Sequence, residues 1–176
     1  MNPKKFVFAL EEGNLLGHIV SKEGVKIDPT RVQTIKKIPL PRSKKDIQFF
    51  LGKINFPRIF MSNYAEIVKE ITNTLKKENE VHWTKEPKES FSRIKEALQV
   101  TIVLISPDYQ KPFQIFSFAS PSSIAVVLLQ KNDEGKEKSI SFFSKVLRDV
   151  EFKCNILERQ VYNLVKALKD FRTYVL

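Results

Sequence analysis

The sequence predicts an α+β fold in two modules, and three features indicate it. Short apolar runs separated by glycine-containing turns fill the first 28 residues. Three more strand-like runs lie between residues 113 and 143. The segments around them repeat apolar residues every three to four positions, which is typical of amphipathic helices. We therefore expect a β-hairpin with a helical module, followed by three antiparallel strands with a packed helix.

The N-terminal segment is predicted to form short strands. Apolar residues alternate over 6–10, the turn-forming residues Glu12-Gly13-Asn14 follow, and a second apolar run covers 15–21. Another turn at 22–24 leads into a strand at 25–27. Such spacing favours a hairpin or meander. Because two or three strands are marginally stable alone, we expect this piece to belong to a larger sheet.

Helix start signals follow this segment. Asp28 before Pro29 predicts an N-cap with proline at the first helical position, where its missing N–H costs nothing. Ser43 with Asp46 three residues later resembles a capping box. These two signals predict helices that begin near residues 29 and 44.

The second of these helices should break before the third begins. Pro57 lies inside its apolar pattern, and a mid-helix proline costs roughly 3 kcal/mol, which predicts a kink or break at 55–57. A third helix is expected over 65–77, where isoleucine and leucine recur four residues apart. The polar stretch 76–80 is the best candidate for a domain boundary.

The second module is predicted to contain a helix, three strands and a final helix. Thr84 can cap a helix over 84–99, and strands are expected at 113–119, 123–130 and 138–143, the last two joined by a turn. A final helix is expected at about 155–174. Its predicted apolar stripe is Leu157, Val161, Leu164, Val165, Leu168 and Phe171.

Positive charge is concentrated in one stretch. The formal net charge is +10, and the segment from Arg31 to Arg58 holds eight basic residues and one acidic residue, Asp46. The basic residues are Arg31, Lys36, Lys37, Arg42, Lys44, Lys45, Lys53 and Arg58. Such a cluster favours binding of phosphate groups without reading sequence. By charge alone, a solvated helix surface is an equally good interpretation.

Composition excludes several other classes. The single cysteine, Cys154, rules out a disulfide framework and a cysteine-based zinc site, so metal binding would need carboxylates. No apolar run approaches the roughly 18–20 residues of a membrane span. The N-terminus lacks the apolar region of a secretory signal, so we expect an intracellular protein with no membrane partner.

Short motifs spread over nearly the whole chain carry a family resemblance. They are Leu15-Leu16-Gly17-His18-Ile19-Val20-Ser21, Gly24-Val25-Lys26-Ile27-Asp28-Pro29, Phe50-Leu51-Gly52, Trp83-Thr84, Pro107-Asp108-Tyr109, Lys111-Pro112-Phe113, Val126-Val127-Leu128-Leu129-Gln130 and Phe171-Arg172-Thr173-Tyr174. In this order they resemble the pol polyprotein of gypsy-type LTR retrotransposons, specifically of a plant lineage.

The resemblance implies three parts. Residues 1–28 look like the end of a reverse-transcriptase palm, 29–80 like its thumb, and 81–176 like a connection and a truncated RNase H-like domain. The turn Leu16-Gly17-His18 would correspond to a primer grip, where glycine lets the strand approach a nucleic-acid backbone. An ordinary hairpin glycine is an equally good interpretation of that turn.

The resemblance also implies that catalytic residues are lost. RNase H chemistry uses clustered carboxylates to hold two Mg²⁺ ions. Phe118 stands at the position of the first catalytic Asp and Gln160 at that of the Glu. The third Asp would follow Leu176, and the polymerase Tyr-x-Asp-Asp loop would precede Met1. We therefore expect no catalytic residues, no bound Mg²⁺ and no cofactor in the isolated chain.

Three functions remain open at this stage. The leading one is a catalytically incompetent fragment of a retrotransposon reverse transcriptase that binds duplexes or RNA–DNA hybrids weakly and nonspecifically. The alternatives are a domesticated protein-interaction module and a portion of a larger active polyprotein. The strand at 113–119 would also have an unpaired edge, which predicts self-association.

Overall fold

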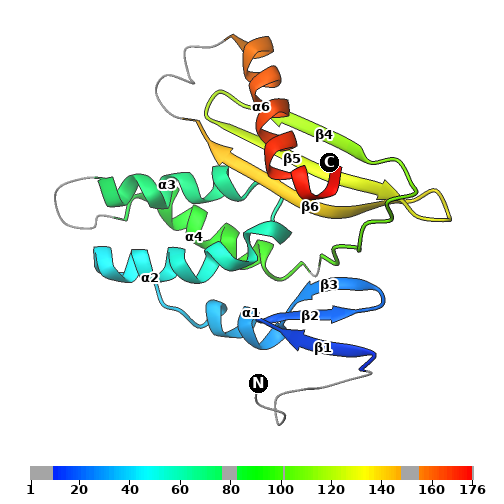
Figure 1. Cartoon of the computed structure of the whole chain (residues 1–176). Coiled ribbons are helices and arrows are strands. Elements are labelled where there is room, and N and C mark those ends of the chain that lie inside the picture. The colour runs from blue at the N-terminus through cyan, green and yellow to red at the C-terminus, as the bar shows by residue number, and fades with distance from the viewer. Residues whose placement is uncertain (1–9, 77–82, 101, 148–154, 176) are drawn as a thin grey trace, which may run out of the picture.

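The computed structural model describes residues 10–76, 83–100, 102–147 and 155–175. Two antiparallel three-stranded sheets lie on either side of a group of helices, and another helix packs on the second sheet (Figure 1). This arrangement confirms the predicted α+β class. None of the helices in these ranges is long and apolar enough to cross a membrane.

The first sheet has three strands: β1 (Glu12–Leu15), β2 (His18–Ser21) and β3 (Gly24–Ile27), in the order β1-β2-β3. The expected turn between β2 and β3 is confirmed. The turn predicted at residues 12–14 is wrong, because those residues belong to β1. The strand predicted at 6–10 lies almost wholly outside the described residues.

The first turn of this sheet is formed by Leu16 and Gly17 instead. Both have positive φ angles, 53° and 82°, which a two-residue hairpin turn between antiparallel strands requires. The Asn14 side-chain oxygen accepts a hydrogen bond from the Gly17 N–H at 3.1 Å. This local bond fixes the turn three to four residues beyond Gly13.

The helical module follows in chain order. It consists of α1 (Pro29–Lys36), α2 (Lys44–Asn55), η2 (Phe56–Phe60), α3 (Tyr64–Lys76) and α4 (Lys85–Ala97). Their buried side chains form one core: Ile35, Ile47, Phe50, Ile54, Met61, Ile67, Val68, Ile71, Phe91, Ile94 and Leu98. The apolar faces predicted for these helices therefore form the core, and α4 shares this core although the sequence analysis places it in the second module.

Local signals set the helix ends as predicted. The Asp28 carboxylate accepts from the Thr30 N–H at 2.8 Å, which caps α1. At the start of α2, the Ser43 hydroxyl accepts from the Asp46 N–H at 3.1 Å, and the Asp46 carboxylate accepts from the Ser43 N–H at 3.0 Å. The helix ends before Pro57, which lies buried in the 3₁₀ turn η2. The predicted break is confirmed.

The second sheet consists of β4 (Gln114–Ala119), β5 (Ser123–Lys131) and β6 (Glu137–Val146), in the order β4-β5-β6. All three predicted strands are confirmed, and the turn at 132–135 joins the last two. The segment that precedes β4 contacts the first sheet, where Val25 of β3 and Leu104 exchange two backbone hydrogen bonds of 2.7 and 2.9 Å.

The last helix differs from its prediction in which side it buries. It is divided into α6 (Ile156–Asp170) and α7 (Arg172–Val175), and α6 packs on β4 and β5. Asn163, Ala167 and Phe171 are fully buried against the sheet. Of the predicted apolar stripe only Phe171 is buried; Leu157, Val161, Leu164, Val165 and Leu168 are 41–68% exposed. The small side chain of Ala167 and the polar side chain of Asn163 therefore face the sheet, in place of the predicted leucines and valines.

Candidate nucleic-acid interface

One face of α2 combines exposed lysines with an exposed aromatic ring. Lys45, Phe49 and Lys53 are four residues apart, so they lie in line along the helix. Phe49 is 57% exposed, and the Lys53 ammonium lies 5.2 Å from the centre of its ring. The opposite face holds the fully buried Ile47 and Phe50. The core therefore orients the three exposed side chains toward solvent.

Gly52 lies on the same exposed face. A Cβ atom at this position would meet no other atom within 4 Å, so the helix surface there is open. An open backbone surface between Phe49 and Lys53 allows another chain's backbone to approach closely. A ring for stacking, two cations and this open position are the elements that bind a phosphate backbone with its bases.

The other basic residues of the predicted cluster vary in exposure. Lys37, Arg42, Lys45, Lys53 and Arg58 are exposed, whereas Arg31, Lys36 and Lys44 are half-buried. Arg42 and Lys37 lie on the segment between α1 and α2, close in sequence to the exposed face of α2. The structure therefore brings only part of the cluster onto one surface.

Arg31 contacts both η2 and the first hairpin turn. Its guanidinium carbon lies 3.7 Å from the centre of the Phe56 ring, and its Nη1 donates to the Leu16 carbonyl at 3.2 Å. A Cβ atom at Gly17 would collide with the same guanidinium. Arg31 thus holds the first hairpin turn against the helical module, and phosphate binding would require it to break this contact.

Arg58 points to a different surface. Its Nη1 donates to the Asn55 side-chain oxygen at 3.3 Å, and the side chain lines a pocket beside β6 with Tyr64 and Asp170. Burial raises the pKa of the Tyr64 hydroxyl to about 12 and raises that of Asp170, while Arg58 opposes both shifts. Arg58 is therefore separate from the α2 face.

The turn that resembles a primer grip is packed against η2. The His18 imidazole stacks on Phe56 with ring centres 4.2 Å apart, and Arg31 contacts the same phenyl ring. Burial, and then the Arg31 charge, lowers the pKa of His18. Leu16 at the tip is 81% exposed. Of the three predicted residues, His18 is structural, Gly17 permits the turn, and Leu16 is free to contact a ligand.

The two positions matched to RNase H carboxylates lie on two elements that pack together, β4 and α6. The Asn163 side-chain amide donates to the Phe118 carbonyl at 2.9 Å, and Arg159 donates to the Ser120 carbonyl at 3.2 Å. Gln160 lies between these two helix residues in sequence and is exposed, as is Phe118. The backbone of Phe118 thus lies beside α6, whereas its side chain lines a pocket with Ser62 and Asn63.

The side chains at these positions do not fit Mg²⁺. A phenyl ring cannot coordinate the ion, and Mg²⁺ in proteins is held by carboxylates. Across the part of the chain that the structure describes, no group of three or more His, Cys, Asp or Glu side chains is placed to hold a metal ion.

Phe49 is the residue that the sequence interpretation missed. The apolar positions 47, 50 and 54 mark the buried side of α2, and position 49 falls outside them. A phenylalanine between two lysines and off the buried stripe was the available signal. No local pattern reveals the ring contact of Arg31, because Phe56 lies 25 positions later in the sequence.

Comparisons with known proteins agree with this geometry. The family described as "RNase H-like domain found in reverse transcriptase" matches residues 83–176. The Pol polyprotein from Drosophila melanogaster transposon 297 is 36% identical over 173 residues, which is 98% of this chain and 16% of that protein. The corresponding protein from transposon gypsy is 30% identical over 187 residues, 99% of this chain and 18% of that protein. The Tf2-3 polyprotein of Schizosaccharomyces pombe is 23% identical over 175 residues.

Solved reverse transcriptases share the fold. Foamy viral protease-reverse transcriptase bound to an RNA/DNA hybrid has a TM-score of 0.80 and 28% identity, over 92% of this chain and 22% of that one. The same protein bound to dsDNA has a TM-score of 0.83 and 27% identity, over 98% and 36%.

The relatives also correct one expectation. They come from a fly and a yeast, so the comparisons support the gypsy family and not the plant lineage expected from the sequence. The chain spans less than a fifth of the length of these curated relatives. It belongs to the family of RNase H-like domains found in reverse transcriptase, within the reverse transcriptase and RNase H-like region of retrotransposon Pol polyproteins.

Proposed function

We propose that this chain binds the sugar-phosphate backbone of duplexes and RNA–DNA hybrids, weakly and without sequence preference. We also propose that the isolated chain has neither polymerase nor RNase H activity. The binding half of the proposal rests on one observation, the exposed α2 face with Lys45, Phe49 and Lys53 around the open surface at Gly52. Lysines on such a surface contact phosphates and carry no sequence information.

The solved relatives support the choice of ligand. The foamy viral enzymes of the same fold were determined with an RNA/DNA hybrid and with dsDNA. Both ligands present regularly spaced phosphates, and a protein with a net charge of +10 attracts either one. The exposed ring of Phe49 adds a contact to a sugar or an unpaired base at a duplex end.

The proposed absence of catalysis rests on Phe118 and Gln160. RNase H-type cleavage depends on two metal ions that stabilise the attacking and leaving oxygens. A phenyl ring cannot hold such an ion, and a single amide oxygen holds it poorly. The sequence also contains no adjacent Asp-Asp pair of the kind that the resemblance assigns to polymerase ligands.

Fluorescence anisotropy with a labelled hybrid and a labelled duplex tests the binding. Each phosphate contact on a duplex contributes about −0.9 to the slope of log K against log salt. The double variant Lys45→Gln, Lys53→Gln should therefore bind more weakly and make the slope shallower by about 1.8.

The matched control is Lys22→Gln, Lys138→Gln, which removes two exposed lysines outside α2 and the same total charge. It should retain the wild-type slope. Equal loss in both double variants would show that net charge, and not the α2 face, governs binding. Absence of binding by the wild type at about 50 mM salt would refute the proposal.

A further inference from the structure

A cavity of about 260 Å³ lies beside the outer edge of β6. Its walls are formed by η2 and the start of α3, by residues 141–146 of β6, and by Asp170 at the end of α6. Among the described residues, none from β4 or β5 lines it, so it lies on the side of β6 that faces away from β5. In Figure 1, β6 is the strand of the second sheet that runs next to α3.

The backbone of β6 presents hydrogen-bonding groups to this cavity. The Leu147 N–H donates to the Ser122 carbonyl at 2.9 Å, so these two residues form a hydrogen-bonded pair directly beyond the ladder of β5 and β6. Bonded and non-bonded pairs alternate along an antiparallel ladder. The backbone groups of Phe142 and Ser144 therefore point away from β5, toward the cavity.

Two opposite charges line the cavity without forming an ion pair. Arg58 and Asp170 are both exposed, so they lie at its mouth. Within the described residues, Asp170 makes no hydrogen bond or ion pair, and the Arg58 side chain donates to Asn55 alone. Burial raises the pKa of Asp170, and the nearby Arg58 charge lowers it in part. A ligand with acceptors for the guanidinium and donors for the carboxylate would bridge the two.

The Tyr64 hydroxyl is a third polar group of the same wall. It makes no hydrogen bond to any residue in the described ranges, and burial raises its pKa to about 12, so it is a neutral donor or acceptor. The Ser144 hydroxyl accepts from the Ala65 N–H at 3.0 Å, which holds the start of α3 against β6. This bond fixes the wall in which the Tyr64 hydroxyl has no partner.

The size and lining of the cavity favour a single planar ring system. Small-molecule sites usually measure about 300–1,000 Å³, and this cavity lies just below that range. Ile59, Val68 and Phe142 contribute apolar lining between the polar groups. A heteroaromatic ring suits such a site, because its faces pack on apolar walls while its rim carries donors and acceptors.

Among the nucleobases, guanine has the best matching rim. Its O6 and N7 are neighbouring acceptors, which an arginine binds with two hydrogen bonds. Its N1–H and 2-amino group are neighbouring donors on the next part of the rim, and a carboxylate has two oxygens that can accept them. Adenine instead has its amino donor between two acceptors, so it cannot serve both charges with paired bonds.

We propose that this cavity binds the base of a guanine nucleotide, with Arg58 donating to O6 and N7 and Asp170 accepting from N1–H and the 2-amino group. The Tyr64 hydroxyl and the β6 backbone supply the remaining partners, and the sugar and phosphate extend out of the mouth. The base can come from a free nucleotide or from an unpaired guanine of a nucleic-acid strand. The site is separate from the exposed face of α2.

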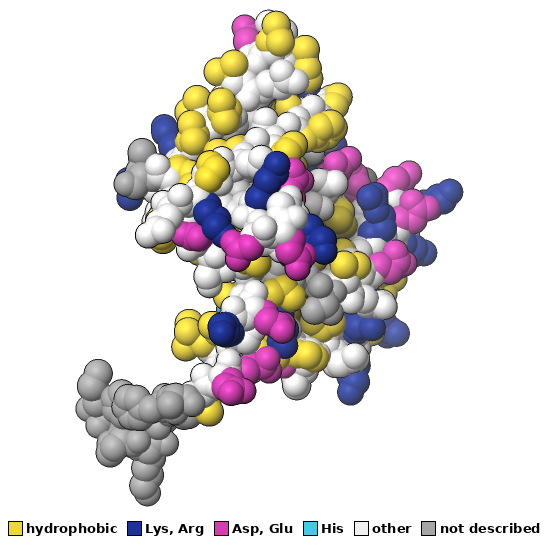
Figure 2. Space-filling view, turned by 90° about the vertical axis from the view of Figure 1, so that its right-hand side faces the viewer, with side chains coloured by type: hydrophobic (Ala, Val, Ile, Leu, Met, Phe, Trp, Pro, Cys, Tyr) yellow, Lys and Arg dark blue, Asp and Glu magenta, His cyan; other side chains and the backbone are white. Residues whose placement is uncertain are grey.

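Net charge would not select guanine. On the face shown in Figure 2, basic and acidic side chains are interspersed over the middle of the molecule. Contacts between charged side chains and phosphates carry no information about the base. A preference among nucleotides of equal charge must therefore come from groups that contact the base itself.

Protein-observed NMR titrations of the whole chain with guanosine, inosine and adenosine monophosphate (GMP, IMP and AMP) test the site. We expect GMP to bind with a Kd below about 1 mM. IMP lacks the 2-amino group and should bind at least about threefold more weakly, because one donor to Asp170 is lost. AMP should bind at least about tenfold more weakly, because it leaves polar groups of the site unpaired.

Two variants assign the base contacts. Asp170→Asn should weaken GMP binding at least about tenfold and remove most of the difference between GMP and IMP. Arg58→Gln should weaken GMP and IMP alike, because both carry O6 and N7. The matched controls are Glu96→Gln and Arg93→Gln, at exposed residues of α4 that do not line the cavity, and both should bind GMP like the wild type. The same spectra show whether each variant is folded.

Two further titrations separate this site from the α2 face and separate the two sources of guanine. The variant Lys45→Gln, Lys53→Gln should bind GMP like the wild type, so this proposal and the proposed backbone binding can fail independently. An oligothymidylate with one central guanine displaces GMP if the site accepts a base from a strand, whereas a free-nucleotide site leaves GMP bound. The oligothymidylate without guanine should not displace it.

Four outcomes would overturn the proposal. They are no GMP binding at about 5 mM, equal affinity for GMP and AMP, unchanged GMP binding in Asp170→Asn, and equal losses in the two α4 controls. Displacement of GMP by an equal concentration of a free amino acid would also contradict it, because the two charges would then bind a zwitterion and not a base.

Discussion

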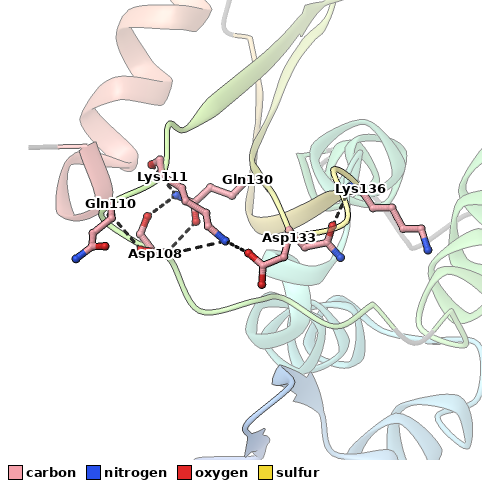
Figure 3. A network of polar contacts seen from close by, with 7 residues as sticks. Asp108, Gln110, Lys111, Gln130, Asp133 and Lys136 are labelled. Carbon is pink, nitrogen blue, oxygen red and sulfur yellow. Dashed lines mark hydrogen bonds and ion pairs between the residues drawn. The ribbon is translucent and has the colours of Figure 1, made fainter.

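The side-chain amide of Gln130 and the backbone of Asp108 exchange two hydrogen bonds. Gln130 Oε1 accepts from the Asp108 N–H at 2.9 Å, and its Nε2 donates to the Asp108 carbonyl at 2.7 Å (Figure 3). A third bond runs from Nε2 to the Lys111 carbonyl at 3.0 Å. Gln130 is 1% exposed. The side chain thus fixes the segment that leads into β4 onto the end of β5.

Replacing this amide should destabilise the second sheet. Gln130→Met keeps the length of the side chain but leaves the Asp108 N–H and the carbonyl groups of Asp108 and Lys111 without their partner. An unsatisfied buried polar group costs about 1–3 kcal/mol. Because water can reach some of the three groups, we expect the free energy of unfolding to fall by about 2–4 kcal/mol. Urea unfolding followed by circular dichroism gives the difference. Gln33→Met, at an exposed glutamine on α1, should change stability by less than about 0.5 kcal/mol.

Lys95 joins α4 to the end of α1. Its ammonium donates to the Lys36 carbonyl at 2.8 Å and to the Ile38 carbonyl at 2.5 Å, where a helix end leaves carbonyls unpaired. Lys95→Met should lower the free energy of unfolding by about 1–2 kcal/mol, because both carbonyls lose a charged donor. Lys88→Met, at an exposed lysine of the same helix, is the matched control. Equal melting temperatures for the two variants would contradict this role.

The stability of the hairpin should depend on pH through His18. Burial, followed by the nearby Arg31 charge, lowers the pKa of His18 in the folded protein. In the described part of the chain its Nε2 is buried without a hydrogen-bond partner. The unfolded chain, with a histidine pKa of about 6.5, therefore binds the proton more readily than the folded chain does. The resulting stability is present above about pH 6.5 and is lost as the pH falls toward the folded pKa.

His18→Phe should remove this dependence. The ring can still stack on Phe56, and it takes up no proton. Denaturant unfolding of the wild type at about pH 7.5 and about pH 5.5 should show lower stability at the acidic value, and the variant should show a smaller loss. His82→Gln removes the other histidine of the sequence and should keep the wild-type difference. A loss that is unchanged in His18→Phe would assign the pH effect to carboxylates.

Sequence predicted those features that depend on neighbouring residues. The caps at Asp28 and Ser43 and the helix break at Pro57 were found because each is decided by bonds within one turn. The first hairpin turn lies beyond the segment Glu12-Gly13-Asn14 that predicts it, because a glycine alone does not fix a turn. The Asn14 side chain decides the turn instead, by accepting from the Gly17 N–H.

Features set by long-range contacts were predicted less well. Periodicity shows that α6 has an apolar stripe, but it does not show that the side of the helix with Asn163 faces the sheet. That side is set by the Asn163 side-chain amide, which donates to the carbonyls of Phe118 and Ala125. For the candidate site, charge alone predicts the lysines of α2, and their role in binding stays a prediction. The engagement of Arg31 with Phe56 was not, because the two residues belong to different elements.

The isolated chain should not cleave the RNA strand of a hybrid. Hydrolysis of a phosphodiester by this fold depends on carboxylates that position two metal ions at the reacting oxygens. Phe118 and Gln160 stand at two of the matched positions, where a phenyl ring cannot bind Mg²⁺ and an amide oxygen alone binds it poorly. Each 1.36 kcal/mol of lost transition-state stabilisation lowers the rate tenfold, so loss of several kcal/mol leaves no measurable activity. A labelled hybrid incubated with Mg²⁺ or Mn²⁺ should stay intact under conditions where anisotropy shows it bound. Cleavage that follows the protein peak through purification and stops with EDTA would refute this prediction.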